Sequence, residues 1–371
     1  MTKQPHPHLT AATKIGAVTL SHRIVMAPLT RMRATVPGDV PGPLMVEYYG
    51  QRASEGGLII SEATTISETA RGYLGAPGLY TDAQVAGWRQ VTAAVHAKGG
   101  RIFAQLWHVG RVSHVDLAGG AAPVAPSAVS FDGMAFTAQG WVPVSPPRAL
   151  TVAEIPALID DYRRAAERAK AAGFDGIEIH AGNGYLIDQF LQDGTNKRTD
   201  SYGGSVENRA RLLFEVVDAV RGVWDATQIG IRLSPSSQFQ EMSDSNPEAT
   251  FGHVGARANQ YGLAYLHVIE PRIKGNAAIE EGLPPVAASL LKRAFKGTII
   301  AAGGFEPASA DAILAEGAAD LVAFGRHFIA NPDLPKRIAR DLPLNAYDRD
   351  TFYGGGHRGY TDYPFYEDAQ A

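Results

Sequence analysis

The sequence contains no cysteine among its 371 residues. This absence excludes disulfide bonds, cysteine-ligated zinc, iron–sulfur clusters and a thiol nucleophile. The chain also lacks a run of about 18 apolar residues, the length that a transmembrane helix requires. Its first residues, Met-Thr-Lys-Gln-Pro-His-Pro-His, lack the apolar core of a signal peptide. We therefore expect a cytoplasmic protein that does not bind a membrane.

An excess of charge of one sign is missing as well. The 34 Lys and Arg residues nearly balance the 38 Asp and Glu residues, so the net charge is −4. No basic face of the kind that nucleic acid requires is expected. What the chain does contain is 45% hydrophobic residues, enough for a large core, and 40 glycines, which suit many short turns between strands and helices.

Eight short apolar runs alternate along the chain with longer amphipathic segments. The predicted strands are 23–29, 57–63, 101–107, 176–180, 229–233, 265–270, 298–303 and 321–325. The predicted helices are 44–54, 82–98, 152–172, 205–224, 247–261, 284–295 and 307–316. Thr151 and Glu154 form a helix-start signal, and Gly99, Gly100 and Gly173 are stop signals.

This order predicts an α/β fold, a single (β/α)8 TIM barrel that spans residues 1–371 as one domain. A doubly wound sheet is the alternative, but no Gly-x-Gly-x-x-Gly turn follows the first strand. Two segments lie outside the repeat. Residues 10–22, with Gly16 at a turn, are expected to form a hairpin that plugs the bottom of the barrel. Residues 112–150 form a long excursion after the third strand, on the side where barrel enzymes keep their active sites.

The most informative segment is 176–190, where a short buried strand leads into His180, Asn183 and Tyr185. His180 and Asn183 can both donate a hydrogen bond to one oxygen atom, and Tyr185 offers an acidic proton from another direction. Two donors aimed at an oxygen that becomes negative, together with a proton source, are suited to the reduction of a polarised double bond.

Polar residues also occupy inward-facing positions of the predicted strands. Gln105 shares a face with Phe103 and Trp107, Glu178 shares one with His180, and Arg232 lies on the fifth strand. Arg232 could pair with Glu178 as structural filling. A bound polar ligand is the more economical explanation for Gln105, His180 and Arg232 together, because a buried polar group without a partner costs about 1–3 kcal/mol.

A second cluster follows the last two strands. Gly303 and Gly304 end the seventh strand, and Gly325 and Arg326 end the eighth. Backbone amides freed by glycine at these two strands, with an arginine beside them, form the common phosphate site of barrel enzymes. Glycines that serve only tight turns are the alternative.

Other chemistry finds little support in the sequence. His108, His114 and the pair His6 and His8 have no carboxylate or third histidine at metal-ligand spacing, so no metal site is expected. A Schiff-base lyase would need a lysine at the end of a strand, and the predicted strands contain none. Asp188 is expected to be a hydrogen-bonding residue of its loop and not a base.

Taken together, the motifs resemble the Old Yellow Enzyme family of FMN-dependent ene-reductases over nearly the whole chain. The matching segments are 23–31, 61–64, 72–78, 103–111, 180–185, 198–204, 231–235, 325–326 and 359–364. Position 30 carries threonine, where a sister group carries cysteine. In this respect the chain resembles the subgroup of pentaerythritol tetranitrate reductase and morphinone reductase. The His-x-x-Asn form of the site, His180 to Asn183, is one of the two forms that the family carries.

The resemblance implies non-covalently bound FMN. Pro28, Leu29, Thr30 and Ala63 are expected to line the isoalloxazine, with Thr30 hydrogen-bonded to the flavin O4. Gln105 is expected at the pyrimidine edge, and Arg232 near N1, where it stabilises the negative charge of the reduced flavin. His180 also belongs to the flavin site. Gly303, Gly304, Gly325 and Arg326 are expected to hold the phosphate.

The resemblance further implies a reaction. NADPH or NADH gives a hydride to flavin N5, and an α,β-unsaturated carbonyl compound, imide or nitroalkene then takes it at its β-carbon. His180 and Asn183 hold the substrate oxygen, and Tyr185 protonates the α-carbon. Nitro compounds, nitrate esters and quinones are further candidate oxidants. A flavin-binding protein without this chemistry is the rival hypothesis.

The resemblance also suggests which residues surround the substrate. The expected pocket residues are Tyr73, Trp107, Phe239, Gln240 and Tyr353, although Phe239 could equally serve packing. Arg272 and Lys274 could contact a nicotinamide 2′-phosphate, or could be ordinary surface charges. The loop 112–150 departs most from the family pattern and is expected to help choose the substrate. A monomer and a homodimer are both compatible with the sequence.

Overall fold

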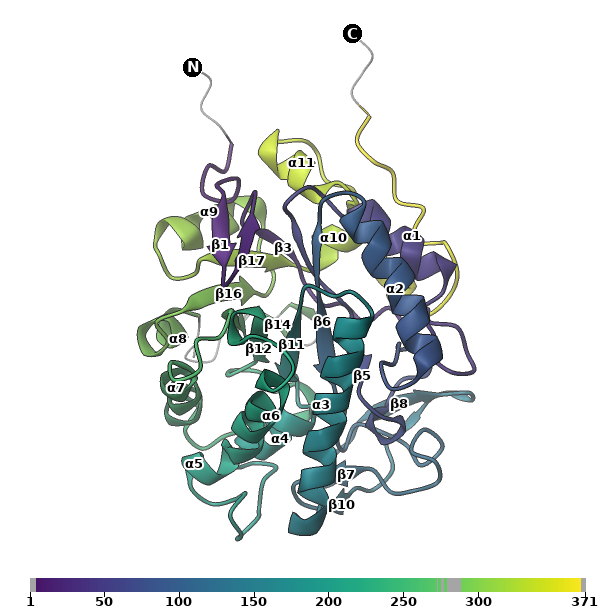
Figure 1. The fold of residues 1–371 in the computed structure, drawn as a ribbon, viewed down its shortest axis with the longest axis vertical. Helices are drawn as coiled ribbons and strands as arrows, with labels where there is room; N and C mark the ends of the chain where they lie inside the picture. Colours follow the sequence, from purple (N-terminus) through teal and green to yellow (C-terminus); the bar gives the residue numbers. More distant parts are fainter. Residues whose placement is uncertain (1–4, 272, 275–276, 279–287, 368–371) are drawn as a thin grey trace.

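A computed structural model describes residues 5–271, 273–274, 277–278 and 288–367. Eight parallel strands form its centre (Figure 1). They are β3 (Ile24–Met26), β4 (Leu58–Ile60), β6 (Arg101–Trp107), β11 (Gly176–Ala181), β12 (Ile229–Leu233), β13 (Tyr265–Ile269), β16 (Thr298–Ala302) and β17 (Leu321–Phe324). Each strand pairs with its neighbour, and β6 pairs with β11, so the sheet closes on itself. The predicted TIM barrel is confirmed, and the doubly wound sheet is wrong.

The helices surround the barrel (Figure 1). The longer ones are α1 (Pro43–Arg52), α2 (Asp82–His96), α3 (Ile155–Ala171), α6 (Arg211–Arg221), α7 (Pro247–Ala258), α8 (Ala288–Ala294) and α9 (Pro307–Ala315). Short helices α4 (Leu186–Leu191), α5 (Val206–Arg209), α10 (Arg326–Ala330) and α11 (Leu334–Ala339) were not predicted as separate elements. The predicted helix 205–224 is divided between α5 and α6, and residues 284–287 of another predicted helix lie outside the described part.

The predicted helix boundaries have the expected local causes. The Glu154 carboxylate accepts a hydrogen bond from the Thr151 backbone N–H at 2.8 Å, which closes the turn before α3. Gly99 and Gly173 adopt φ angles of 71° and 84° after α2 and α3. This left-handed conformation is readily available only to glycine and ends each helix at that point.

The bottom of the barrel is closed by the predicted hairpin, formed by β1 (Thr13–Ile15) and β2 (Val18–Leu20). Ile15 and Leu20 are buried in the same apolar cluster as Phe103 and Tyr265 of the barrel interior. Gly16 has a φ of 51°, and a Cβ atom there would lie 2.0 Å from the carbonyl oxygen of Thr227. Glycine therefore allows the hairpin to press against the start of β12.

The excursion after β6 contains four short strands, β7 (Val124–Ala125), β8 (Met134–Thr137), β9 (Gly140–Pro143) and β10 (Arg148–Ala149). Strands β8 and β9 form an antiparallel hairpin, and β7 pairs with β10. The hairpin is tied to the preceding loop, because the Leu74 N–H donates to Phe136 O at 2.7 Å. In Figure 1, β7 and β10 lie at the end of the molecule opposite the N-terminal hairpin.

None of the helices within the described ranges is both long and apolar enough to cross a membrane. Strand β5 (Thr64–Thr65) pairs with β6 beyond the end of β4 and takes no part in closing the barrel.

Candidate active site

A cavity of about 630 Å³ opens at the C-terminal ends of the barrel strands. Every residue that the sequence assigned to the site lines it. These residues are Pro28, Leu29, Thr30, Ala63, Tyr73, Gln105, Trp107, His180, Asn183, Tyr185, Arg232, Phe239, Gln240, Gly303, Gly304, Gly325, Arg326 and Tyr353. They come from segments separated by as many as 325 positions, and the closed barrel brings them to one opening.

His180 lies near the end of β11, opposite Arg232 in the register of β11 and β12. Its Nδ1 accepts a hydrogen bond from the Gly182 backbone N–H at 3.4 Å. Burial, reinforced by the positive charge of Arg232, holds the pKa of His180 well below its usual value. The imidazole is therefore neutral, and the proton resides on Nε2, which makes that atom a hydrogen-bond donor.

Asn183 is held in place by a chain of hydrogen bonds behind it. Its φ is 56°, a left-handed conformation that asparagine tolerates better than most residues. Its backbone N–H donates to Ser234 Oγ at 2.6 Å, and Ser234 Oγ in turn donates to Asp188 at 3.3 Å. Asp188 also accepts from the Gly184 N–H at 2.8 Å. The backbone around Asn183 is thus fixed by buried groups.

Asp188 therefore has the loop-stabilising role expected from the sequence. It is fully buried, and burial raises its pKa to about 7.

Gly184 is the close-contact point of the same loop. A Cβ atom there would lie 2.7 Å from Gln240 Cβ and 2.9 Å from Met242 Cγ. Glycine at this position lets the loop after β12 approach the His180–Tyr185 segment.

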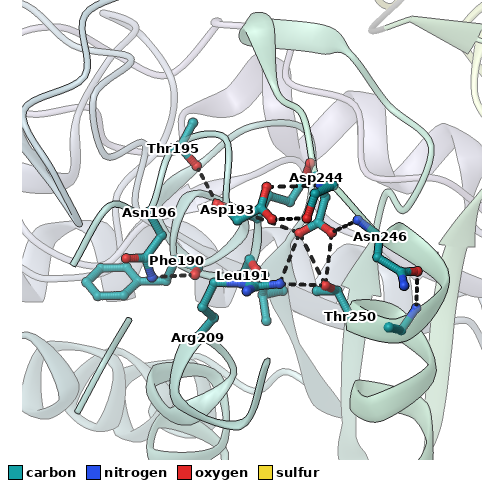
Figure 2. Close-up of polar contacts among 12 residues, drawn as sticks. Phe190, Leu191, Asp193, Thr195, Asn196, Arg209, Asp244, Asn246 and Thr250 are labelled. Atoms are coloured by element: carbon teal, nitrogen blue, oxygen red, sulfur yellow. Dashed lines mark hydrogen bonds and ion pairs between the residues drawn. The ribbon is translucent and has the colours of Figure 1, made fainter. Parts of the chain in front are cut away.

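The far end of the loop after β12 is anchored by a buried carboxylate, Asp244. Figure 2 shows Asp244 among Asp193, Arg209 and Thr250. Its Oδ2 accepts from the Asp193 N–H at 3.2 Å and from Arg209 Nη2 at 3.3 Å, and Arg209 Nη2 also donates to Thr250 at 2.8 Å. Arg209 Nε donates to the Leu191 carbonyl at 2.7 Å, which ties the loop to α4 (Figure 2). This anchor fixes the chain that brings Phe239 and Gln240 to the cavity.

Tyr185 is surrounded by aromatic rings. The centroid of its ring lies 4.9 Å from that of Trp107 and 5.2 Å from that of His180, both in edge-on geometry. Tyr73 packs against the same Trp107 ring, with a centroid distance of 5.7 Å. Burial raises the pKa of Tyr185 well above 10. The phenol therefore keeps its proton at neutral pH and can deliver it to a bound molecule.

A buried polar network lies beneath these residues. Gln105 Nε2 donates to Glu178 Oε1 at 2.7 Å, and His267 Nδ1 lies 2.8 Å from Glu178 Oε2. Arg232 Nη1 donates to the Pro28 carbonyl at 3.4 Å. Arg232 and Glu178 make no direct ion pair, because Gln105 and His267 hold the carboxylate, although the two opposite charges still favour each other. His267 was missed from the sequence, although a histidine inside an apolar strand is a recognisable signal.

Glycine and arginine meet beyond β16 and β17, as predicted. Gly303 and Gly304 have φ angles of 119° and 65°, and both line the cavity together with Gly325 and Arg326. A Cβ atom on Gly325 would lie 3.2 Å from Leu29 Cδ2. The absence of side chains at these positions leaves backbone amides accessible beside a cation, an arrangement that suits a phosphate group.

Aromatic residues that the sequence did not single out complete the rim. Trp141 of the β8–β9 hairpin is 48% exposed, and its ring makes edge contacts with Tyr73 at 5.9 Å and Tyr353 at 6.3 Å. Met134, Asp132, Tyr347 and Phe352 also line the cavity. The excursion 112–150 thus reaches the site. Its one signal in the sequence was its length, since no local pattern marked Trp141.

The C-terminal segment that carries Tyr353 is held by Arg31. Arg31 Nε donates to the Phe352 carbonyl at 2.8 Å, and Arg31 Nη2 donates to the Gly359 carbonyl at 2.7 Å. Arg31 is buried and immediately follows Thr30 of the cavity wall. The same stretch of chain therefore lines the cavity and fixes the segment that covers it.

Several other sequence expectations lie outside the site. His108 is buried, its Nδ1 accepts from the Gly110 N–H at 3.0 Å, and burial lowers its pKa to about 3, which is a structural role. Arg272 and the side chain of Lys274 lie outside the described residues. Over the ranges that the structure covers, no group of three His, Asp or Glu side chains gathers in metal-binding geometry.

A sequence profile described as the NADH:flavin oxidoreductase / NADH oxidase family matches residues 9–345. The chain belongs to this family. A flavin oxidoreductase of Emericella nidulans is 48% identical over 373 residues, covering 95% of this chain and 96% of the relative. The 12-oxophytodienoate reductase 1 of Oryza sativa subsp. japonica is 49% identical, covering 96% and 92%.

Solved structures of family members agree in fold. Morphinone reductase in complex with tetrahydroNAD is 50% identical, covers 98% of both chains and superposes with a TM-score of 0.90. The old yellow enzyme homologue from Zymomonas mobilis is 44% identical, covers 96% of this chain and 99% of that one, and has a TM-score of 0.91. The resemblance to the Old Yellow Enzyme family is confirmed, and the protein is an FMN-dependent, nicotinamide-using oxidoreductase.

The cavity suits FMN on structural grounds of its own. Trp107 Nε1 and Arg232 Nε are buried donors without a hydrogen-bond partner among the described residues, and both residues line the cavity. Unpaired buried donors are rare in folded proteins and indicate a polar ligand. Glycine amides and Arg326 line the same cavity, and Pro28, Leu29 and Ala63 contribute apolar surface to it.

Proposed function

We propose that this protein reduces the activated carbon–carbon double bond of α,β-unsaturated carbonyl compounds, imides or nitroalkenes. One observation carries the proposal. A neutral histidine, an asparagine in a fixed left-handed turn and a protonated tyrosine, all from residues 180–185, line one cavity together with a buried arginine. Two neutral donors and one separate proton source are what such a reduction requires.

The cavity residues divide by the part of FMN that each would hold. Pro28, Leu29, Thr30 and Ala63 would contact the isoalloxazine, and Gln105 and Arg232 its pyrimidine side. Gly303, Gly304, Gly325 and Arg326 would bind the phosphate through backbone amides and one guanidinium. His180 would lie at the border between the flavin and the substrate. When bound, FMN takes a hydride from a nicotinamide and supplies it to the β-carbon of the alkene.

The protein's own groups then act on the substrate. The donors on His180 Nε2 and the Asn183 amide would hold its electron-withdrawing oxygen and stabilise the negative charge that develops there. Removal of one such donor typically costs about 3–4 kcal/mol of the barrier. Tyr185 would transfer its phenolic proton to the α-carbon. Tyr73, which packs with Tyr185 against Trp107, would line the space next to the proton donor.

The pocket walls favour flat substrates and a flat reductant. Trp107, Tyr73, Trp141 and Tyr353 enclose the opening with aromatic surface, and Gln240 adds a polar group. The nicotinamide and the alkene would use this space in turn. The solved complex of morphinone reductase with tetrahydroNAD supports nicotinamide as the reductant, and the 12-oxophytodienoate reductase relatives support an enone as the oxidant.

Nitro compounds, nitrate esters and quinones are further proposed oxidants, because they accept electrons from the same reduced flavin. Reduction of the alkene is the preferred function, since it uses both the pair of oxygen-binding donors and a separate proton donor for the α-carbon. A flavin-binding protein without this chemistry would leave His180, Asn183 and Tyr185 without a role.

An anaerobic titration tests the proposal. The purified protein should be yellow, should bleach when NADH or NADPH is added, and should regain its colour when 2-cyclohexenone is added in stoichiometric amount. A yellow protein that bleaches but stays reduced in the presence of the enone would contradict the ene-reductase function. A colourless protein that FMN cannot reconstitute would remove the flavin site itself.

A further inference from the structure

Three side chains form a polar layer directly beneath the cavity. Glu178 of β11 accepts hydrogen bonds from Gln105 of β6 at 2.7 Å and from His267 of β13 at 2.8 Å. The side chains of Glu178 and His267 have no exposed surface. Gln105 and Arg232 line the cavity above them, whereas neither Glu178 nor His267 reaches it.

Below this layer the barrel is filled by aromatic rings. The centroids of Phe103 and Tyr265 lie 6.0 Å apart, and a Cβ atom on Gly230 would lie 2.3 Å from the Tyr265 ring. Glycine at 230 therefore makes room for the ring that seals the floor. A carboxylate in such dry surroundings is costly unless it is paired and fully hydrogen-bonded.

The charge states of the layer follow from its contacts. Burial opposes ionisation of Glu178, but His267, Arg232 and Gln105 outweigh it and hold the pKa of Glu178 below its usual value. Burial and Arg232 lower the pKa of His267 despite the nearby carboxylate. His267 is thus a neutral imidazole that donates through Nδ1, and the negative charge of Glu178 is balanced by Arg232.

Glu178 also fixes the orientation of the Gln105 amide. An ionised carboxylate can only accept hydrogen bonds, so the NH₂ group of Gln105 must face Glu178. The Gln105 side chain lines the cavity, and its carbonyl oxygen is the group left for a ligand there. The pyrimidine ring of an isoalloxazine presents an N–H donor between two carbonyl groups, which matches an acceptor at this position.

From these contacts we propose that Glu178 is a positioning residue of the flavin site. It presents the Gln105 carbonyl to the flavin and, as a buried anion that offsets the charge of Arg232, holds the reduction potential of the flavin down. This inference rests on the proposed function, because it takes Gln105 and Arg232 as the residues at the pyrimidine side. Glu178 itself acts through these two neighbours and does not touch the flavin.

The sign of the effect on the potential follows from the charges. The reduced flavin carries more negative charge than the oxidised flavin, so a nearby anion disfavours reduction. Arg232 favours it, and Glu178 offsets part of that influence in a medium where charges interact more strongly than in water. Removal of the Glu178 charge should therefore raise the midpoint potential.

The first test is a comparison of Glu178→Gln with His267→Gln by spectroelectrochemical titration of the FMN-loaded proteins. Glutamine at 178 keeps the size and can still accept from Gln105, while the neutral His267 can exchange its tautomer. We expect the ratio of reduced to oxidised flavin at a fixed potential to rise about tenfold in Glu178→Gln, a shift of about 30 mV for a two-electron couple.

His267→Gln is the matched control, because it alters the same buried layer, retains a donor to Glu178 and removes no charge. Its midpoint potential should equal that of the wild type. An unchanged or lowered potential in Glu178→Gln would overturn the proposal. An equal rise in both variants would also overturn it, because that result would assign the effect to disturbed packing.

The second test addresses the amide orientation through the affinity of the apoprotein for oxidised FMN, measured by quenching of flavin fluorescence. Glu178→Leu removes the acceptor that orients Gln105, and we expect its dissociation constant to rise about tenfold, as for the loss of one hydrogen bond. Glu178→Gln should keep near wild-type affinity. Equal affinity in all three proteins would refute the positioning role.

These outcomes are distinct from a failure of the proposed function. A wild-type protein that binds FMN but does not reduce enones would leave both measurements intact, since neither uses an alkene. A wild-type protein that cannot bind FMN would refute both proposals, and the absorption spectrum of the wild type shows this before any variant is made.

Discussion

Replacement of Tyr185 by phenylalanine separates the proton donor from the rest of the site. The change removes one oxygen atom and keeps the ring, whose contacts with Trp107 at 4.9 Å and His180 at 5.2 Å are made by carbon atoms. Loss of the hydroxyl should cost at most about 1 kcal/mol of folding free energy, the usual contribution of one hydrogen bond. Tyr185→Phe should therefore fold and bind FMN normally.

The catalytic effect should be much larger than the structural one. Proton transfer by a positioned side chain contributes about 100- to 10,000-fold to a rate. We expect Tyr185→Phe to slow reoxidation of the reduced flavin by 2-cyclohexenone by a factor in this range. Reduction of the flavin by the nicotinamide should stay near the wild-type rate, because that step needs no proton from Tyr185.

Anaerobic stopped-flow absorbance measures the two half-reactions separately. Tyr73→Phe is the matched control, since it removes a phenolic hydroxyl from the same aromatic cluster and should slow the enone step far less. Because burial holds the pKa of Tyr185 well above 10, the wild-type enone step should be independent of pH from about 6 to 9. Equal reoxidation rates in wild type and Tyr185→Phe would refute the assignment, as would equal slowing of both half-reactions.

Three further predictions follow from single regions of the structure. Arg326→Ala should weaken FMN binding about tenfold or more through loss of a charged phosphate contact, and unchanged fluorescence titration would contradict the phosphate site. Asp132 and Glu241 place two carboxylates at the cavity mouth, where they should repel the additional phosphate of NADPH. The double variant Asp132→Asn, Glu241→Gln should therefore raise kcat/KM for NADPH more than for NADH. Equal changes with both cofactors would contradict a repulsion of this phosphate. Burial raises the pKa of Asp188 from 3.8 to about 7, so its contribution to stability is full below about pH 4 and is lost as pH rises through 7. The Tm of Asp188→Asn relative to wild type should therefore rise between about pH 4 and 7 and level off above pH 7, and a constant difference would contradict the linkage.

The barrel was predictable because each part of it has a local signal. Parallel barrel strands are buried on both faces, so they appear as continuous apolar runs such as 321–324. Gly99 and Gly173 ended their helices for reasons of backbone conformation that glycine itself reveals. His180, Asn183 and Tyr185 could be recognised because they directly follow a strand, and strand ends are where barrel enzymes hold their catalytic residues.

Other features depend on tertiary contacts that leave no local pattern. Trp141 reaches the cavity only because the β8–β9 hairpin is tied to residues 72–74 through Phe136, a contact between segments about 63 positions apart. His267 and Glu178 lie on β13 and β11, which are not adjacent in the barrel. The alternation of inward-facing and outward-facing residues within one strand could therefore not predict their hydrogen bond. The predicted helix 205–224 is interrupted directly after Arg209. The Arg209 side chain is hydrogen-bonded to Leu191, Asp244 and Thr250, which are distant in the sequence.

A crystal structure of the yellow protein with a cyclic enone would test the central claim most directly. The account predicts a flavin ring against Pro28 and Ala63, a phosphate beyond β16 and β17 at Gly304 and Arg326, and an enone oxygen within hydrogen-bond distance of both His180 Nε2 and the Asn183 amide. A phosphate bound elsewhere, or an enone oxygen that contacts neither donor, would contradict it.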